Sequence, residues 1–122
     1  MRYVVLLADD PRGWETATEA EREAVMQAHT DFDKAVRERA SMVAGEALAD
    51  ASEARTLRPG AGGRSVTDGP YAEAAEQLGG FYVIDAPDLD TVTELCQLLP
   101  ASYTIEIRPV VVIDGYDYEA RG

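Results

Sequence analysis

The chain has 122 residues, of which 46% are hydrophobic, and its 11 basic and 23 acidic side chains give a formal net charge of −12. This length and composition predict a single folded domain with a hydrophobic core, and they exclude an intrinsically disordered protein. So acidic a chain would repel phosphate groups, which argues against binding to nucleic acid or to an anionic membrane.

The first predicted elements are a strand and a long helix. Tyr3–Leu7 (YVVLL) is a short apolar run that ends at two aspartates and a proline, which is typical of a buried strand. Thr18 and Glu21 have the spacing of a capping box, so we expect a helix that runs to about Arg39. The apolar face of this helix is predicted to carry Val25, Phe32 and Val36.

The middle of the chain predicts two strands with a hairpin between them. Met42–Leu48 (MVAGEAL) is expected to form a strand with a kink at its glycine. Arg55–Arg58 and Arg64–Thr67 flank the sequence PGAGG, which is typical of a hairpin loop. Phe81–Ile84 follows a pair of glycines and is predicted to be the next strand.

The last third of the chain predicts a helix and a final strand. Asp88–Leu99 places apolar side chains at helical spacing, with Asp88 as the N-cap. Tyr103–Arg108 (YTIEIR) alternates apolar and polar residues, as a strand does. Val110–Ile113 (VVVI) either prolongs that strand or forms an edge, and a polar acidic tail follows. We therefore divide the chain into a domain of residues 1–110 and an extension with a tail, residues 111–122.

The order of these elements indicates the fold class. Strand, helix, strand, hairpin, strand, helix and strand form a ferredoxin-like α+β pattern with an inserted hairpin. The helices would cover only one face of the sheet in such a two-layer domain. A second copy of the chain is the simplest cover for the other face, so we expect a homodimer.

Two features bear on where the protein works. Cys96 is the single cysteine and cannot form a disulfide within the chain, which fits a reducing compartment. The apolar run near the N-terminus is too short for a signal peptide or a membrane span. We therefore expect a cytoplasmic protein.

His29, the only histidine, is the first candidate for chemistry. Its spacing from Val25 and Phe32 places it on the apolar face of the predicted helix. Two interpretations stay open: a satisfied core residue, or a general acid or base beside a cavity, for which an ordinary pKa of about 6.5 is well suited. Asp33, one turn later, could orient the imidazole or be a solvated surface carboxylate.

Asp68 is the second candidate. It begins the sequence Asp-Gly-Pro, whose residue types suit a turn. The functional interpretation is a carboxylate presented at the end of a strand, where pockets often open. Both interpretations stay open at this point.

Other polar residues could contact a ligand. Glu106 and Arg108 share one face of the last predicted strand, which is either exposed or lines the interior of a dimer, where Arg108 could hold an anionic group. Tyr71 and Tyr82 are interpreted as packing residues whose hydroxyl groups need partners. One histidine and one cysteine give no metal-ligand spacing, and PGAGG lacks the lysine of a phosphate-binding loop. We therefore predict no metal and no cofactor.

The stretch VTDGPYAEAAEQLGGFYVID, with MVAGEAL before it and IEIRPV after it, resembles the YCII-related proteins of the DGPF type. The resemblance extends from Arg2 to about Val110; Tyr71 replaces the last residue of the DGPF signature, and Ala75 stands where a lysine is common. It implies a ferredoxin-like protomer that pairs into a dimeric α+β barrel. Related barrels include lyases, isomerases and monooxygenases that work without a cofactor, and many DGPF relatives lie near genes for sigma factors.

The resemblance also bears on the candidate residues. The wider family carries a histidine on its first helix, and HTDF (His29–Phe32) matches that setting. An acid–base pair has been proposed there with an aspartate after the second helix, where this chain has LLPAS, so Asp68 is the candidate substitute. We predict a cofactor-independent lyase or isomerase acting on a small polar organic molecule. Its expected catalytic residues are His29 and Asp68, and its expected substrate contacts are Arg108, Glu106, Tyr71 and Tyr82. The alternative is a non-catalytic small-molecule-binding or regulatory module linked to a sigma factor.

Overall fold

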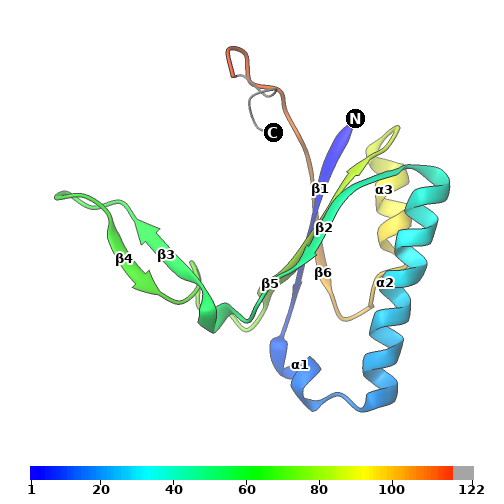
Figure 1. The fold of residues 1–122 in the computed structure, drawn as a ribbon, viewed down its shortest axis with the longest axis horizontal. Helices are drawn as coiled ribbons and strands as arrows, with labels where there is room; N and C mark the ends of the chain where they lie inside the picture. Colours follow the sequence, from blue (N-terminus) through cyan, green and yellow to red (C-terminus); the bar gives the residue numbers. More distant parts are fainter. Residues whose placement is uncertain (117–122) are drawn as a thin grey trace.

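The computed structural model describes residues 1–116 as one antiparallel sheet with helices on one face and a hairpin that projects from it (Figure 1). The last part of the predicted acidic tail, residues 117–122, lies outside the described residues. No helix in the described part of the chain is long and apolar enough to cross a membrane.

The central sheet has four strands in the order β2-β5-β1-β6, with antiparallel neighbours throughout. The strands are β1 (Arg2–Asp9), β2 (Ser41–Ala47), β5 (Gln77–Asp85) and β6 (Thr104–Pro109). The first and last strands are thus neighbours, and β5 separates β1 from β2. This is the arrangement expected of a ferredoxin-like α+β fold, so the predicted fold class is confirmed for a single chain.

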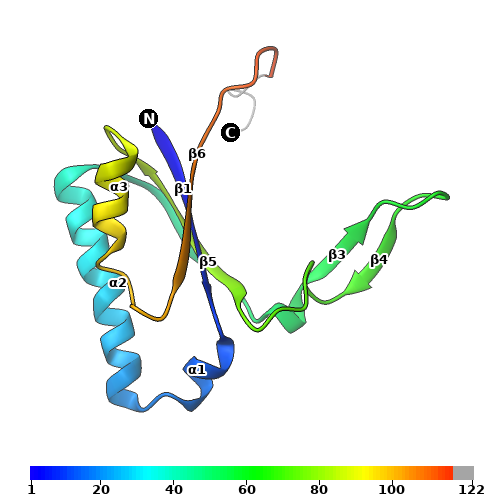
Figure 2. The ribbon, with the colours of Figure 1, turned by 180° about the vertical axis from the view of Figure 1, so that it is seen from behind.

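Two helices, α2 (Glu19–Arg39) and α3 (Leu89–Cys96), cover the same face of the sheet (Figures 1 and 2). The predicted capping box at the start of α2 is confirmed, because the Thr18 hydroxyl accepts from the Glu21 N–H and the Glu21 carboxylate accepts from the Thr18 N–H, both at 3.1 Å. Asp88 caps α3, as predicted, by accepting from the Thr91 N–H at 2.8 Å. The α-helix ends at Cys96, and turn-type hydrogen bonds carry the chain on to Leu99.

A short helix that the sequence analysis did not predict, α1 (Pro11–Thr16), follows β1 directly. Asp10 is its N-cap and Pro11 occupies its first turn, where the missing N–H of proline costs nothing. The helix presents Trp14 toward α2. There the Arg22 guanidinium lies 5.0 Å from the Trp14 ring centroid and donates to the Trp14 carbonyl.

The core lies between the sheet and helices α2 and α3. Phe32 and Val36 of α2 and Ile84 of β5 are completely buried. The predicted apolar face of α2 is therefore confirmed for Phe32 and Val36. The rest of this core consists of Tyr3, Val5, Leu7, Ala86, Val92, Leu95, Cys96 and Leu99. Val25, the third predicted residue of that face, is half-buried.

The opposite face of the sheet, here called the open face, is not covered by any described element (Figures 1 and 2). Its side chains alternate with those of the core. Val4 pairs with Val83, and Leu6 pairs with Phe81, so an apolar patch forms at its centre. A single chain therefore leaves half-buried apolar side chains facing outward.

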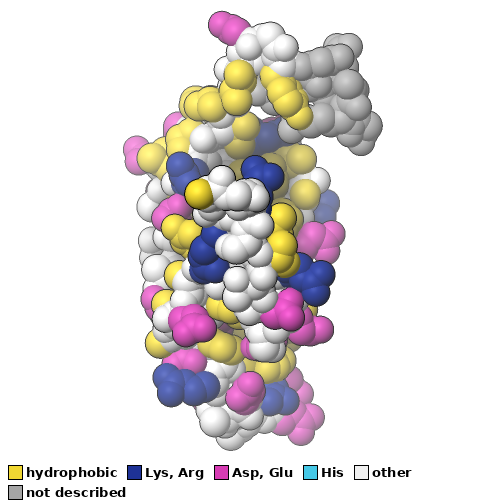
Figure 3. All heavy atoms as spheres, turned by 90° about the vertical axis from the view of Figure 1, so that its left-hand side faces the viewer, with side chains coloured by type: hydrophobic (Ala, Val, Ile, Leu, Met, Phe, Trp, Pro, Cys, Tyr) yellow, Lys and Arg dark blue, Asp and Glu magenta, His cyan; other side chains and the backbone are white. Residues whose placement is uncertain are grey.

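Two segments extend beyond this two-layer body. The hairpin of β3 (Arg55–Arg58) and β4 (Ser65–Asp68) was predicted from the sequence and projects away from the sheet, after a short 3-10 turn, η1 (Ala51–Glu53). Figure 3, which faces its tip, shows basic and hydrophobic side chains on the same surface. Residues 110–113 form neither of the predicted strands and expose their apolar side chains.

Candidate active site

His29 lies on the face of α2 that meets the sheet, and both nitrogens of its ring are hydrogen-bonded. Nδ1 lies 2.7 Å from the Tyr82 hydroxyl, and Nε2 lies 2.9 Å from the Tyr103 hydroxyl. Tyr82 comes from β5 and Tyr103 directly precedes β6, so two strands and one helix build this cluster. We call Tyr82, His29 and Tyr103 the relay, because a neutral imidazole donates at one nitrogen and accepts at the other.

The surroundings of the relay keep all three groups uncharged at neutral pH. Burial lowers the pKa of His29 below its ordinary value. Burial also raises the pKa of both tyrosines, and the charge of Asp9 raises the pKa of Tyr103 further. A charged imidazolium and a tyrosinate are therefore both disfavoured here.

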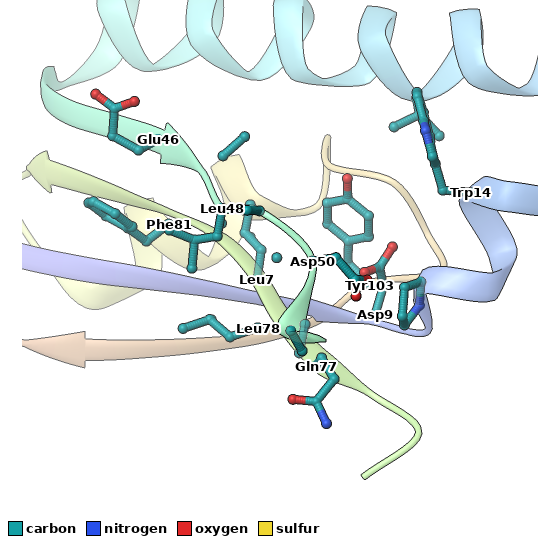
Figure 4. A pocket seen from close by; sticks show the side chains of 18 of the residues that line it. Leu7, Asp9, Trp14, Glu46, Leu48, Asp50, Gln77, Leu78, Phe81 and Tyr103 are labelled. Carbon is teal, nitrogen blue, oxygen red and sulfur yellow. The ribbon is translucent and has the colours of Figure 1, made fainter. Parts of the chain in front are cut away.

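The relay forms part of the wall of a cavity of about 720 Å³. The other walls come from the end of β1, helix α1, the segment from β2 to η1, and the first half of β5 (Figure 4). Most of the lining residues are apolar, among them Leu7, Trp14 and Val25. Its volume lies within the usual range of about 300–1,000 Å³ for small-molecule sites.

Gly45 on β2 is required by this arrangement. A Cβ atom at this position would lie 2.6 Å from the Tyr82 ring, closer than real contacts allow. The Tyr82 ring thus occupies the space where a side chain of β2 would lie. The glycine predicted to kink the strand instead makes room for one end of the relay.

Asp9, the last residue of β1, is the carboxylate of the cavity whose surroundings best suit a role in binding or catalysis. It lines the cavity and is half-buried, and burial, followed by the charges of Asp10 and Glu76, raises its pKa. Among residues 1–116, no group donates a hydrogen bond or forms an ion pair with its side chain. Figure 4 shows Asp9 and Tyr103 at the same end of the cavity. A partly desolvated carboxylate without a hydrogen-bond partner is suited to bind a ligand that donates a hydrogen bond to it.

The family model of the YCII-related domain matches residues 1–114 of the chain. The chain belongs to the YCII-related family. An uncharacterised protein of Rhizobium meliloti (strain 1021) is 33% identical over 116 residues, which cover 92% of this chain and 94% of that protein. The resemblance seen in the sequence is therefore confirmed.

Asp68 does not lie with His29 in this YCII-related chain. It ends β4 on the projecting hairpin, its side chain is exposed, and its partner is the Arg55 guanidinium at 3.2 Å. The chain turns after it at Gly69, whose φ of 116° suits glycine. The structure thus places the Asp-Gly-Pro corner away from the cavity, and two tyrosines orient the imidazole in place of an aspartate.

The remaining predicted ligand contacts divide in the same way. Tyr82 lines the cavity, whereas Tyr71 is exposed on the hairpin side of the chain. Glu106 and Arg108 lie on the open face, where they pair with Leu6 and Val4 of β1, and their side chains are 3.9 Å apart. Neither residue lines the cavity. Asp33 accepts a hydrogen bond from Arg37 at 2.9 Å on the surface, which supports its interpretation as a solvated carboxylate.

Cys96 takes no part in the site. Cys96 is buried in the core, and burial raises the pKa of its thiol to about 11, so it is not a nucleophile at neutral pH. Residues 1–116 contain no group of three or more potential metal ligands.

Asp9 and Asp10 provide a matched pair for a stability test. The raised pKa of Asp9 means that its ionised form disfavours folding above that pKa. Asp9→Asn is therefore expected to raise the melting temperature at pH 7 by about 1–3 °C. The Arg12 side chain and N–H, in contrast, lower the pKa of Asp10. Asp10→Asn should leave the melting temperature unchanged or lower it.

Thermal denaturation of both variants between pH 4 and pH 8 checks this prediction. The advantage of Asp9→Asn should shrink as the pH falls and Asp9 becomes protonated in the folded protein. A lower melting temperature for Asp9→Asn at pH 7 would show that the Asp9 carboxylate has a stabilising partner in solution.

Proposed function

We propose that this YCII-related protein is a cofactor-independent isomerase that moves a proton between two positions of a small organic molecule. The observation that carries this proposal is that both ring nitrogens of His29 are hydrogen-bonded to tyrosine hydroxyls, and that all three side chains line one cavity. An imidazole held at both nitrogens can take a proton from one partner and release its other proton to the second.

One turnover moves four protons and leaves every group of the relay neutral. A carbon of the ligand gives its proton to the Tyr82 oxygen while the Tyr82 hydroxyl proton moves to Nδ1 of His29. The proton on Nε2 moves to the Tyr103 oxygen, and the former hydroxyl proton of Tyr103 passes to a second position of the ligand. The C–H electron pair becomes the new double bond, and the displaced double bond takes up the delivered proton. His29 ends in its other tautomer and is reset by exchange with water.

The pKa directions favour concerted transfer. Because burial raises the pKa of Tyr82 and Tyr103, a free tyrosinate would be a costly intermediate. Burial also keeps His29 neutral, which the relay requires. Asp9 is the carboxylate of the site in place of Asp68, and it accepts a hydrogen bond from the ligand near Tyr103.

Solvent isotope exchange tests the reaction class without knowledge of the natural substrate. In D₂O the proton delivered by Tyr103 is a deuteron, because tyrosine hydroxyls exchange with water. Hydroxyketones, aminoketones and cyclic enones are incubated with the protein and followed by NMR. Deuterium incorporation together with formation of the isomer is expected for at least one class. Incorporation no faster than in buffer alone for every class would contradict the proposal.

We also propose that two chains pair through the open face. Val4, Leu6, Phe81 and Val83 form an apolar patch there that a second sheet would remove from water. Val83→Arg is expected to raise the dimer dissociation constant by about 100-fold or more, because unpaired charges would become buried. Light scattering after gel filtration measures the mass, and Thr93→Arg on α3 is the control. The link to a sigma factor stays a prediction based on the resemblance alone.

A further inference from the structure

The charged side chains that line the cavity are of one sign. Asp9, Glu15, Glu46 and Asp50 are among the lining residues, and no lysine or arginine of the described chain is. His29, the one basic group present, has its pKa lowered by burial and stays neutral. A carboxylate or phosphate ligand would therefore meet no cationic partner in the cavity and would be repelled by its walls.

Asp9 gives this acidic wall a specific point of attachment. Asp50 accepts hydrogen bonds from the N–H and hydroxyl of Ser52, at 3.0 and 2.6 Å. Its carboxylate is therefore already stabilised by donors of the protein. The Asp9 carboxylate has no such partner in the described residues and has lost part of its hydration, which raises its pKa. An ammonium group would supply the missing hydrogen bonds and the opposite charge, which makes the strong type of hydrogen bond.

The rest of the cavity suits the apolar body of such a ligand. Trp14 lies at the same end as Asp9 (Figure 4), and Leu7 and Val25 are among the other apolar residues that line the cavity. The Trp14 ring already attracts one cation of the protein, the Arg22 guanidinium. An aromatic wall beside a carboxylate is a common way to bind an organic ammonium group.

We infer that the cavity binds a small organic cation, an amine with an apolar body, whose ammonium group pairs with Asp9. This inference rests on the proposed function in taking the cavity beside the relay as the site, and it names the class of substrate. It replaces the predicted anionic group held by Arg108, which lies on the open face and does not line the cavity.

Three probes of similar shape and different charge test the inference: benzylamine, benzyl alcohol and benzoate. Isothermal titration at pH 7 is expected to show that benzylamine binds about tenfold or more tightly than benzyl alcohol, and that benzoate binds more weakly than either. In Asp9→Asn the preference for benzylamine over benzyl alcohol should fall to about twofold or less. Asp10→Asn should keep the full preference, because the Asp10 carboxylate that it removes is already paired with Arg12 and is not the proposed ammonium partner.

The possible results separate this inference from the proposed function. Preferred binding of benzoate, equal binding of all three probes, no binding of any, or a preference that survives Asp9→Asn would each overturn the amine class. Preferred binding of benzylamine without deuterium exchange on any ketone would overturn the isomerase and leave the cation site standing. Exchange on neutral ketones without a preference for amines would do the reverse.

Discussion

Replacement of His29 by glutamine is expected to slow deuterium exchange by about 10²–10⁴-fold, the usual contribution of a general acid–base group. Glutamine can still hydrogen-bond to the hydroxyls of Tyr82 and Tyr103, so the cavity should keep its shape. The amide cannot accept a proton at one atom and release another, so the relay would be broken. Initial rates of deuterium incorporation measured by NMR give the loss directly.

Asp31→Asn is the matched control on the same helix, because the exposed Asp31 carboxylate accepts a hydrogen bond from Gln27 on the surface. Its rate should stay within about twofold of the unmodified protein. The rate of the unmodified protein should also fall in acid, at a pH lower than for an ordinary imidazole, because burial lowers the pKa of His29. A glutamine variant that keeps its rate would remove His29 from the chemistry.

Replacement of Phe32 by alanine is expected to lower the free energy of unfolding by about 3–5 kcal/mol. Phe32 is completely buried, and its ring centroid lies 4.8 Å from that of Tyr82. The substitution removes apolar contacts and leaves a cavity between α2 and the sheet. It also takes away one of the supports that hold the Tyr82 ring against His29.

Urea denaturation followed by circular dichroism measures this loss. Met26→Ala is the comparison, because the Met26 side chain on the same helix is 58% exposed. Its effect should be within about 0.5 kcal/mol. A loss below about 1 kcal/mol for Phe32→Ala would mean that the core closes over the missing ring.

The sequence predicts the elements whose signals are local. The capping box of Thr18 and Glu21, the Asp88 cap and the alternation of YTIEIR each depend on neighbouring residues, and all three are seen in the structure. Helix α1 was missed because Pro11 and Gly13 indicate a turn when read singly. The pair of aspartates could have indicated this helix. Asp10 immediately precedes Pro11 and can serve as its N-cap, so Asp9 is not needed for capping.

The site was only partly predictable, because its partners are distant in the chain. Helical spacing placed His29 toward the sheet, and this was correct. Its hydrogen-bond partners are 53 and 74 residues away, and they meet it only through the pairing of β5 and β6 with β1. Asp68 was expected beside His29, but its position depends on the direction of the hairpin, which no local pattern encodes.

Gly45 has a consequence for comparisons within the family. Because the ring of residue 82 fills the space above this glycine, the two positions are sterically coupled. We expect a relative with alanine or a larger residue at the position of Gly45 to carry a smaller or displaced side chain opposite it, which would remove or shift the phenol on that side of the imidazole. Glycine at position 45 together with tyrosine at position 82 is thus expected to mark the homologues that can form the same relay.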